Sequence, residues 1–224
     1  TIEEEVFEFS SLESIQIPSS VTSIGKNAFC GCSNLKFVNI PNDSKMSVIS
    51  KRLFSTSGIK SFDLPPSIVR IEKNAFSTSS FEVLNIPNDS KLVYISENAF
   101  GGSKLKRLFI PPLVQKLEEE WCFETCELTK IYISPKNQLF SVIDEKIVVS
   151  KSNINSPNYD TLCFAVRNIE SITIPSFIQT IQSYSFEFCK NLKTIIFANN
   201  SELQSIKKGA FKSSSIASIE LPKK

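Results

Sequence analysis

The sequence contains no histidine in 224 residues. Histidine is the usual general base near neutral pH, the usual partner of a serine or cysteine nucleophile, and the commonest zinc ligand. Its absence excludes chemistry that depends on histidine. Glycine is scarce as well: six occur, and none forms GxGxxG or GxxxxGKS/T, so no phosphate-cradling loop is indicated. No catalytic constellation is visible, and we expect a chain that is not an enzyme and needs no cofactor.

Charge of one sign and long apolar runs are also missing. The chain has 25 Lys and Arg against 23 Asp and Glu, a net charge of +2, and no charge blocks. This balance argues against a nucleic-acid groove or a polybasic membrane surface. No apolar run approaches the ~18 residues that a membrane span requires. We therefore expect no nucleic-acid partner and no membrane span in this segment.

What the sequence does contain is a repeat. An apolar residue followed by proline recurs every 22 to 24 residues, except for one gap of 41. The copies are Ile17-Pro18, Ile40-Pro41, Leu64-Pro65, Ile86-Pro87, Ile110-Pro111, Ile174-Pro175 and Leu221-Pro222, with degenerate copies at Ile133-Ser134 and Phe197-Ala198. A fixed period of this length is typical of solenoids, in which one supersecondary unit is stacked on the next.

A phenylalanine keeps step with the proline, about ten residues before it. The pairs are Val6-Phe7, Ala28-Phe29, Leu53-Phe54, Ala75-Phe76, Ala99-Phe100, Cys122-Phe123, Ser185-Phe186 and Ala210-Phe211. Between the two landmarks lies an L-x-x-I-x-I pattern, as in Leu105-KRLFI and Leu128-TKIYI. Its last residues alternate and end at proline, which predicts one short strand per repeat. The phenylalanines are expected to stack as an interior ladder, because a single repeat cannot bury its own apolar face.

The cysteines follow the same register. Cys32, Cys126 and Cys189 each lie three residues after a ladder phenylalanine, where other repeats have serine. A slot that alternates Cys with Ser suits one small, weakly polar interior side chain. A metal site is disfavoured because Cys30-Gly31-Cys32 offers neither CxxC spacing nor histidine partners. A disulfide stays open as an alternative if stacked repeats bring two cysteines together, with Cys126 and Cys189 as the expected pair.

The pattern I-x-x-x-A-F-x-x-C-x-x-L-x-x-I-x-I-P resembles the BspA-like leucine-rich repeat, also called the Treponema pallidum type. Ile24-GKNAFCGCSNLKFVNIP is an almost ideal copy. The resemblance implies a right-handed leucine-rich-repeat solenoid with one parallel β-sheet, short helical or 3₁₀ turns, and an inserted β-hairpin. We expect a single domain over residues 1–224 with about nine repeats. Trp121 is placed in a helical or 3₁₀ turn at the convex edge.

Residues 135–169 interrupt the period. Asn137-QLFSVIDEKIVVSK, followed by Asp160-TLCFAV, resembles the hairpin that the family inserts, and then a second strand. In the family the turn carries Asp-Gly, and here Glu145 replaces that glycine, which puts the turn geometry in question. Ser152-NINSPNY is predicted to be a loop.

One column of strand residues is expected to face solvent on the concave sheet. It reads Gln16, Asn39, Asp63, Asn85, Phe109, Tyr132, Thr173, Ile196 and Glu220. The column is polar at first and then largely apolar or aromatic, with Arg107 and Lys130 beside its two rings. Exposed aromatic residues rimmed by cations are typical of protein-binding hot spots, so Arg107, Phe109, Lys130, Tyr132 and Ile196 are the candidate partner-binding residues. The competing interpretation is that β-propensity alone explains them.

Three N-x-S sequons, at Asn42, Asn88 and Asn199, follow strands in phase. They are possible glycosylation sites in a secreted protein. The alternative is a recurring turn whose polar side chains bond to local backbone.

The resemblance implies a secreted or surface-exposed protein, since family members are adhesion proteins of mucosal bacteria and protozoan parasites. We therefore expect a recognition module that binds proteins or glycoconjugates on host or microbial surfaces. The alternative is a cytoplasmic structural scaffold, which free cysteines would favour because the cytosol keeps thiols reduced.

Overall fold

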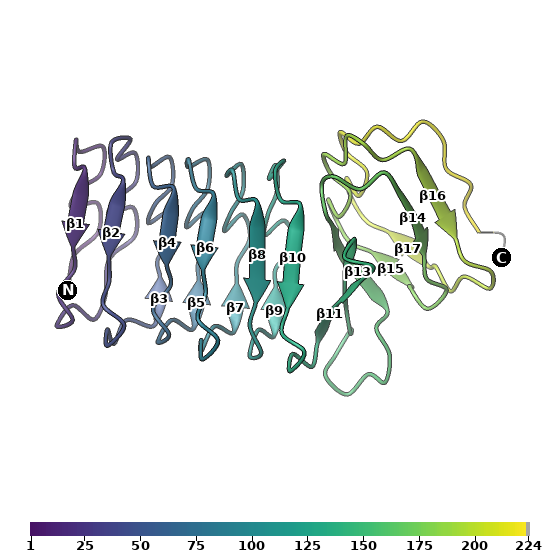
Figure 1. The fold of residues 1–224 in the computed structure, drawn as a ribbon, viewed down its shortest axis with the longest axis horizontal. Coiled ribbons are helices and arrows are strands. Elements are labelled where there is room, and N and C mark those ends of the chain that lie inside the picture. Colours follow the sequence, from purple (N-terminus) through teal and green to yellow (C-terminus); the bar gives the residue numbers. More distant parts are fainter. Residues whose placement is uncertain (223–224) are drawn as a thin grey trace.

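The structure is a computed structural model and describes residues 1–222. The chain winds as a solenoid in which long strands lie side by side from β1 to β10, followed by an insertion and a second set of coils (Figure 1). The long strands are β1 (Ser14–Gln16), β2 (Phe37–Asn39), β4 (Ser61–Asp63), β6 (Val83–Asn85), β8 (Arg107–Ile110), β10 (Lys130–Ile133), β14 (Ser171–Ile174) and β16 (Thr194–Phe197). Each falls on a predicted strand, which confirms the solenoid fold class.

The long strands form what we call the main sheet, and it is not continuous. β1 pairs with β2, β4 to β10 form a four-stranded parallel sheet, and β14 pairs with β16. Register keeps equivalent residues opposite one another, as for Ile131 and Leu108. Along β14 exposed and buried residues alternate, because every second side chain points into the core.

A second row of two-residue strands runs along the solenoid, so the prediction of one parallel sheet is wrong. The second row contains β3 (Val48–Ile49), β5 (Arg70–Ile71), β7 (Tyr94–Ile95), β9 (Lys116–Leu117), β15 (Thr180–Ile181) and β17 (Ser205–Ile206). β3 to β9 pair as one parallel sheet, and β15 and β17 pair in another. Each short strand ends at an apolar residue, which is buried or half-buried in all of them except β17, where Ile206 is exposed.

The convex side is built from successive β-turns, and residues 1–222 contain no α- or 3₁₀-helix. Within one coil the N–H groups of Ala75 and Ser77 donate to the carbonyl three residues back, and Ser79 donates its hydroxyl to the Phe76 carbonyl. The N–H groups between them donate to the next coil instead, as Phe76 does to the Ala99 carbonyl at 2.8 Å. In a helix every N–H bonds to a carbonyl of the same segment. Here every second N–H bonds to the next coil, so the prediction of helical or 3₁₀ turns is wrong.

Two left-handed residues, four positions apart, bracket each of these turns. The pairs are Glu5 and Phe9, Asn27 and Gly31, Arg52 and Thr56, Asn74 and Thr78, Asn98 and Gly102, Glu120 and Glu124, Tyr184 and Phe188, and Gly209 and Ser213. A positive φ is uncommon for residues other than glycine. Its recurrence at two fixed positions is therefore part of the repeat and marks its register.

The phenylalanine ladder forms as predicted in most coils. Rings of Phe29 and Phe54 are 5.7 Å apart and nearly parallel, and those of Phe76 and Phe100 are 5.8 Å apart. After the insertion the stack resumes with Phe186 and Phe211, 5.1 Å apart. Stacked or offset rings at this spacing add to the stabilisation from burial.

The ladder slips by one residue at Trp121. Phe100 donates its N–H to the Trp121 carbonyl, just as Phe76 donates to Ala99. Trp121 therefore takes the alanine position and Cys122 the ladder position, both buried, while Phe123 is only half-buried. The prediction that Phe123 belongs to the ladder is therefore wrong. Trp121 is a core residue.

The same slip moves the small-residue slot. Cys32 and Cys189 are fully buried, as predicted, but Cys126 is exposed. Thr125 fills the slot in its place and donates its hydroxyl to the Phe100 carbonyl at 2.9 Å. All six cysteines are free thiols, so there is no bridge between Cys126 and Cys189.

The insertion contains three strands. β11 (Phe140–Ile143) and β12 (Ile147–Ser150) form the predicted hairpin, and β13 (Thr161–Ala165) pairs antiparallel with β12. β13 then pairs parallel with β15, which joins the insertion to the later coils. The hairpin turn keeps its shape without glycine, because Asp144 and Glu145 both have positive φ. This pair of left-handed residues is typical of a type I′ turn.

Candidate functional site

Four of the five candidate partner-binding residues lie together on the outer face of the main sheet. Arg107 and Phe109 on β8 stand directly opposite Lys130 and Tyr132 on β10. Arg107 and Lys130 are exposed, Phe109 is half-buried, and Tyr132 is 55% exposed. Neighbouring strands of a sheet lie about 4.8 Å apart, so Phe109 and Tyr132 are adjacent on one face and form what we call the aromatic surface, with Arg107 and Lys130 beside it.

The fifth residue does not join them. Ile196 on β16 is 55% exposed and stands opposite Thr173 on β14. β14 and β16 form a separate two-stranded sheet, and no strand connects them to β10 within residues 1–222. The structure therefore divides the predicted apolar column between two sheets.

The polar half of the column bonds to itself. Asn39 donates to Gln16 at 2.8 Å, and Asn85 donates to Asp63 at 2.7 Å. These side chains have partners within the sheet, whereas the Phe109 and Tyr132 faces meet solvent. Phe37 on β2 is a further exposed ring, at 58%, which the column had not singled out. Its partner in register is Ser14 on β1, which carries no ring.

A groove of about 600 Å³ runs along β10, where the four-stranded part of the main sheet ends. Its lining includes the whole of β10, the hairpin residues Val142 and Asp144 to Lys146, and the start of β14. Tyr132 and Lys130 belong both to the aromatic surface and to this groove. The candidate site is thus the outer face of β8 and β10 together with the adjoining groove.

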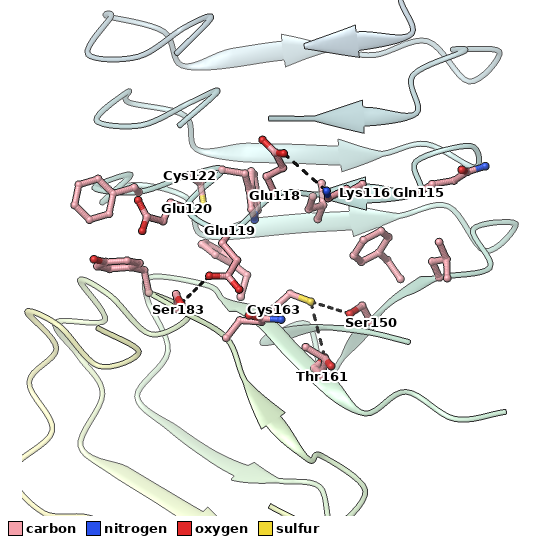
Figure 2. A pocket seen from close by; sticks show the side chains of 18 of the residues that line it. Gln115, Lys116, Glu118, Glu119, Glu120, Cys122, Ser150, Thr161, Cys163 and Ser183 are labelled. Carbon is pink, nitrogen blue, oxygen red and sulfur yellow. Dashed lines mark hydrogen bonds and ion pairs between the residues drawn. The ribbon is translucent and has the colours of Figure 1, made fainter. Parts of the chain in front are cut away.

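A second cavity of about 360 Å³ separates β9 from the insertion (Figure 2). Glu118, Glu119 and Glu120 line one side, and Ser150, Thr161 and Cys163 from β12 and β13 line the other. Glu119 accepts a hydrogen bond from Ser183 at 3.0 Å. The acidic run Glu118 to Glu120 therefore forms one wall of a cavity.

Charges on this wall are partly paired. Burial opposes ionisation of Glu118, but hydrogen bonds from the Tyr94 hydroxyl and the Glu97 N–H lower the pKa of its carboxyl overall. The same hydrogen bond to Glu118 raises the pKa of the Tyr94 phenol. Arg70 lies over the Tyr94 ring at 4.4 Å. These contacts position Glu118 as a structural anion between two coils.

The thiols in this region are poor nucleophiles. Burial raises the pKa of Cys122 and of Cys163 to about 12. Cys163 donates to the Ser150 hydroxyl at 3.1 Å. The thiolate is the reactive form of cysteine, so neither side chain is activated for covalent chemistry. Among residues 1–222 no three His, Cys, Asp or Glu side chains gather in a metal-binding arrangement.

Two buried charges escaped the sequence analysis. Arg167 is 4% exposed and donates to the carbonyls of Thr125, Ala165 and Ser185. Glu187 is fully buried, accepts the Glu124 N–H at 2.9 Å, and lies 3.2 Å from the Lys212 ammonium. The sequence contained a signal for Glu187, because the residue directly after the ladder phenylalanine is small in four earlier copies, Cys30, Ser55, Ser77 and Gly101.

The sequons show the turn that the alternative interpretation predicts. Asn42, Asn88 and Asn199 are exposed. The hydroxyls of Ser44 and Ser90 are buried and accept the N–H two residues later, at 3.2 Å in both cases. Glycosylation of the three asparagines remains a prediction.

Comparison with known proteins agrees with the repeat. The sequence pattern of the BspA type leucine-rich repeat region matches residues 1–129, 78–162 and 158–224, with 6 copies. The chain belongs to the BspA-type leucine-rich repeat family. No curated protein matches it significantly.

Solved structures show the same BspA-type architecture. The pneumococcal vaccine antigen PcpA matches with a TM-score of 0.85 and 29% identity over 94% of this chain and 51% of that one. A leucine-rich cell surface protein from Faecalibacterium prausnitzii A2-165 matches with a TM-score of 0.68 and 21% identity over 96% of this chain and 63% of that one. A leucine-rich repeat protein from Eubacterium ventriosum has a TM-score of 0.77 and 22% identity over 89% of this chain and 51% of that one. The chain spans about half to two thirds of the length of these structures.

No helix in the described part of the chain is long and apolar enough to cross a membrane.

Proposed function

We propose that the chain is a non-enzymatic recognition module of a cell-surface or secreted protein, and that it binds protein on host or microbial surfaces through the outer face of β8 and β10. The observation that carries this proposal is the pairing of Phe109 with Tyr132 next to Arg107 and Lys130. Aromatic residues and arginine dominate the binding energy of protein interfaces. The polar half of the column differs from this pair, since its side chains already bond to one another.

Family membership supports a binding role, because repeat solenoids present extended surfaces to partners. Two of the similar structures are named as a vaccine antigen and as a cell surface protein, which supports a surface location here. A protein partner is favoured over a glycoconjugate by the cation pair beside two rings, although the same face could stack on a sugar.

Location is the first test. Antibody labelling of intact cells of the source organism, compared with permeabilised cells, separates the two locations. Labelling of intact cells supports the surface proposal. Labelling only after permeabilisation contradicts it and favours a cytoplasmic scaffold, a second candidate function that the six free thiols support.

Binding is the second test, with extracellular-matrix proteins and epithelial cells as the panel. Replacing Phe109 and Tyr132 by alanine should weaken the binding of any captured partner by at least ~2 kcal/mol, or about 30-fold in Kd, as expected for hot-spot anchors. The matched control replaces Gln16 and Asn39, which occupy the same column on β1 and β2. Equal loss in both variants, or loss in neither, would overturn the proposed face.

A further inference from the structure

The strand β10 has one neighbour, and its other edge is open. Lys130 and Ser134 donate their N–H groups to the carbonyls of Lys106 and Ile110 beside β8. Backbone groups of successive residues point to opposite edges of a strand, so the N–H and C=O of Ile131 and Ile133 point away from β8. Within residues 1–222 no strand pairs with that edge.

The strand across the groove is open in the same way. The carbonyls of Glu170 and Ile174 accept from Lys193 and Ala198 beside β16, so Ser171 faces the opposite side. Its carbonyl accepts from the Lys146 ammonium of the hairpin at 3.2 Å. A lysine that covers an edge carbonyl is a common way to block strand pairing. Among residues 1–222 no side chain covers the Ile131 or Ile133 backbone groups of β10 in this way.

The groove between these edges combines an apolar floor with an acidic rim. Ile131, Ile133, Val142, Val166 and Ile169 contribute the apolar lining. The lining carries three carboxylates, of Asp144, Glu145 and Glu170, against two ammonium groups, of Lys130 and Lys146. None of the three carboxylates forms an ion pair with another described residue.

We infer that an extended segment of a partner protein, with alternating apolar and basic side chains, adds to the open edge of β10 as an extra strand. Unpaired backbone groups next to an apolar surface are costly, and an extended peptide supplies donors and acceptors at the strand repeat. Its apolar side chains would enter the groove, and its basic side chains would meet the acidic rim. Main-chain bonds then give affinity and the alternating side chains give specificity.

The inference rests on the proposed function, since it names how the recognition module takes its partner. Tyr132 and Lys130 would flank the added strand on the outer face, because they alternate with Ile131 and Ile133 along β10. The aromatic surface and the groove would therefore contact one ligand.

The test uses the full chain and a displayed library of random seven-residue peptides. Enriched peptides are synthesised, their binding is measured by fluorescence anisotropy, and each residue in turn is N-methylated. Strand addition predicts that methylation weakens binding at least tenfold at every second residue and leaves the residues between them unaffected. It also predicts at least tenfold slower amide exchange at Ile131 and Ile133 in the complex.

Charge-reversal variants test the contribution of the carboxylates at the groove. Reversing Asp144 and Glu145 to lysine should weaken the basic peptides at least tenfold, whereas Glu202→Lys, an exposed change on a distant coil, should not. Strand addition is overturned by a library without enriched sequences, by a methylation pattern without a period of two, or by unchanged exchange at the two amides. Protection of these amides by a second copy of the chain, seen as a dimer in sedimentation, would overturn the partner segment as occupant.

Failure of this inference differs from failure of the proposed function. If Tyr132→Ala releases a captured matrix protein while the Ile131 and Ile133 amides exchange freely, recognition by the outer face stands and strand addition does not. If Tyr132→Ala changes nothing and the amides are protected, the groove is used without the aromatic face.

Discussion

Arg167 donates from Nε to the carbonyl of Thr125 at 3.3 Å, across 42 positions of sequence. This bond ties the end of the insertion to the last coil before it. The same guanidinium reaches the Ala165 and Ser185 carbonyls and lies 4.1 Å from the centre of the Phe164 ring. One buried cation thus joins two sets of coils where the regular strand pairing stops.

Replacing Arg167 with methionine should therefore destabilise the protein strongly. The three carbonyls would lose a charged donor, and hydrogen bonds to charged groups contribute about 1.5 to 3 kcal/mol each without adding fully. We expect a loss of about 3 kcal/mol or more in the free energy of unfolding, measured by urea titration with Trp121 fluorescence. Arg167→Lys should recover only part of it, because lysine lacks the planar fork. A loss below about 0.5 kcal/mol in the methionine variant would show that the guanidinium does not hold this junction.

The Lys212 and Glu187 pair should make stability depend on alkaline pH. A hydrogen bond to Glu187 raises the pKa of the Lys212 ammonium above its ordinary value of 10.5. A raised folded-state pKa stabilises the fold below the unfolded pKa, and this contribution is lost as the pH rises through the folded value. The melting temperature of Lys212→Gln should lie below that of the parent by a constant amount from pH 6 to 9.

Above about pH 10.5 that difference should shrink, since both proteins then lack the charge. Lys207→Gln is the control, because Lys207 is exposed on the same coil and forms no ion pair with another described residue. A gap between parent and variant that persists unchanged to pH 12 would mean that the ammonium charge is not what stabilises the contact.

Thiol labelling should report the register slip at Trp121. Cys126 is exposed, whereas Cys122 and Cys163 are held with a pKa of about 12. Three pKa units above the ordinary value of 9.0 leave about a thousandth of the thiolate. Iodoacetamide at pH 8, followed by peptide mass spectrometry, should modify Cys126 in the native protein and reach Cys122 and Cys163 only in urea. If Cys122 is labelled in the native protein while Cys126 is protected, the slip of the ladder at Trp121 is contradicted.

The hairpin turn should be improved by glycine. Glu145 has a φ of 54°, and this conformation costs residues with a Cβ roughly 1 to 2 kcal/mol. Glu145→Gly is expected to raise the free energy of unfolding by about 1 kcal/mol, measured by thermal and urea denaturation. Ser141→Gly in β11 serves as the comparison and should lower it, since glycine weakens a strand interior. A destabilised Glu145→Gly variant would contradict the left-handed turn.

Much of the fold followed from the sequence because inward positions recur at a fixed spacing. Ile110 ends β8 and Ile40 directly follows β2, both at the predicted buried position. Phe29, Phe54, Phe76 and Phe100 stack as the ladder requires. The short strands such as β5 were missed because two residues are too few to show alternation. The slip at Trp121 was missed because Phe123 has the sequence position of a ladder residue. The true register follows from the bond between the Phe100 N–H and the Trp121 carbonyl and from the left-handed Glu120 and Glu124.

The candidate site was predictable in part. Register along parallel strands placed Phe109 beside Tyr132 and Arg107 beside Lys130, as the repeat alignment implies. The separation of Ile196 from them was not predictable, because it depends on how the insertion sits between β10 and β14. The burial of Glu187 depends likewise on Lys212, which lies one coil away in space and 25 positions away in sequence.

The bonding of each convex turn to the next has a consequence for how such chains change length. Every regular coil offers the same donors to one neighbour and the same acceptors to the other. A whole coil can therefore be duplicated or deleted without leaving a backbone N–H or carbonyl unpaired. A deletion within a coil would strand those groups on both sides. The junction at Arg167 is not interchangeable in this way, and it fixes one point in a protein whose length is otherwise free to vary by whole coils.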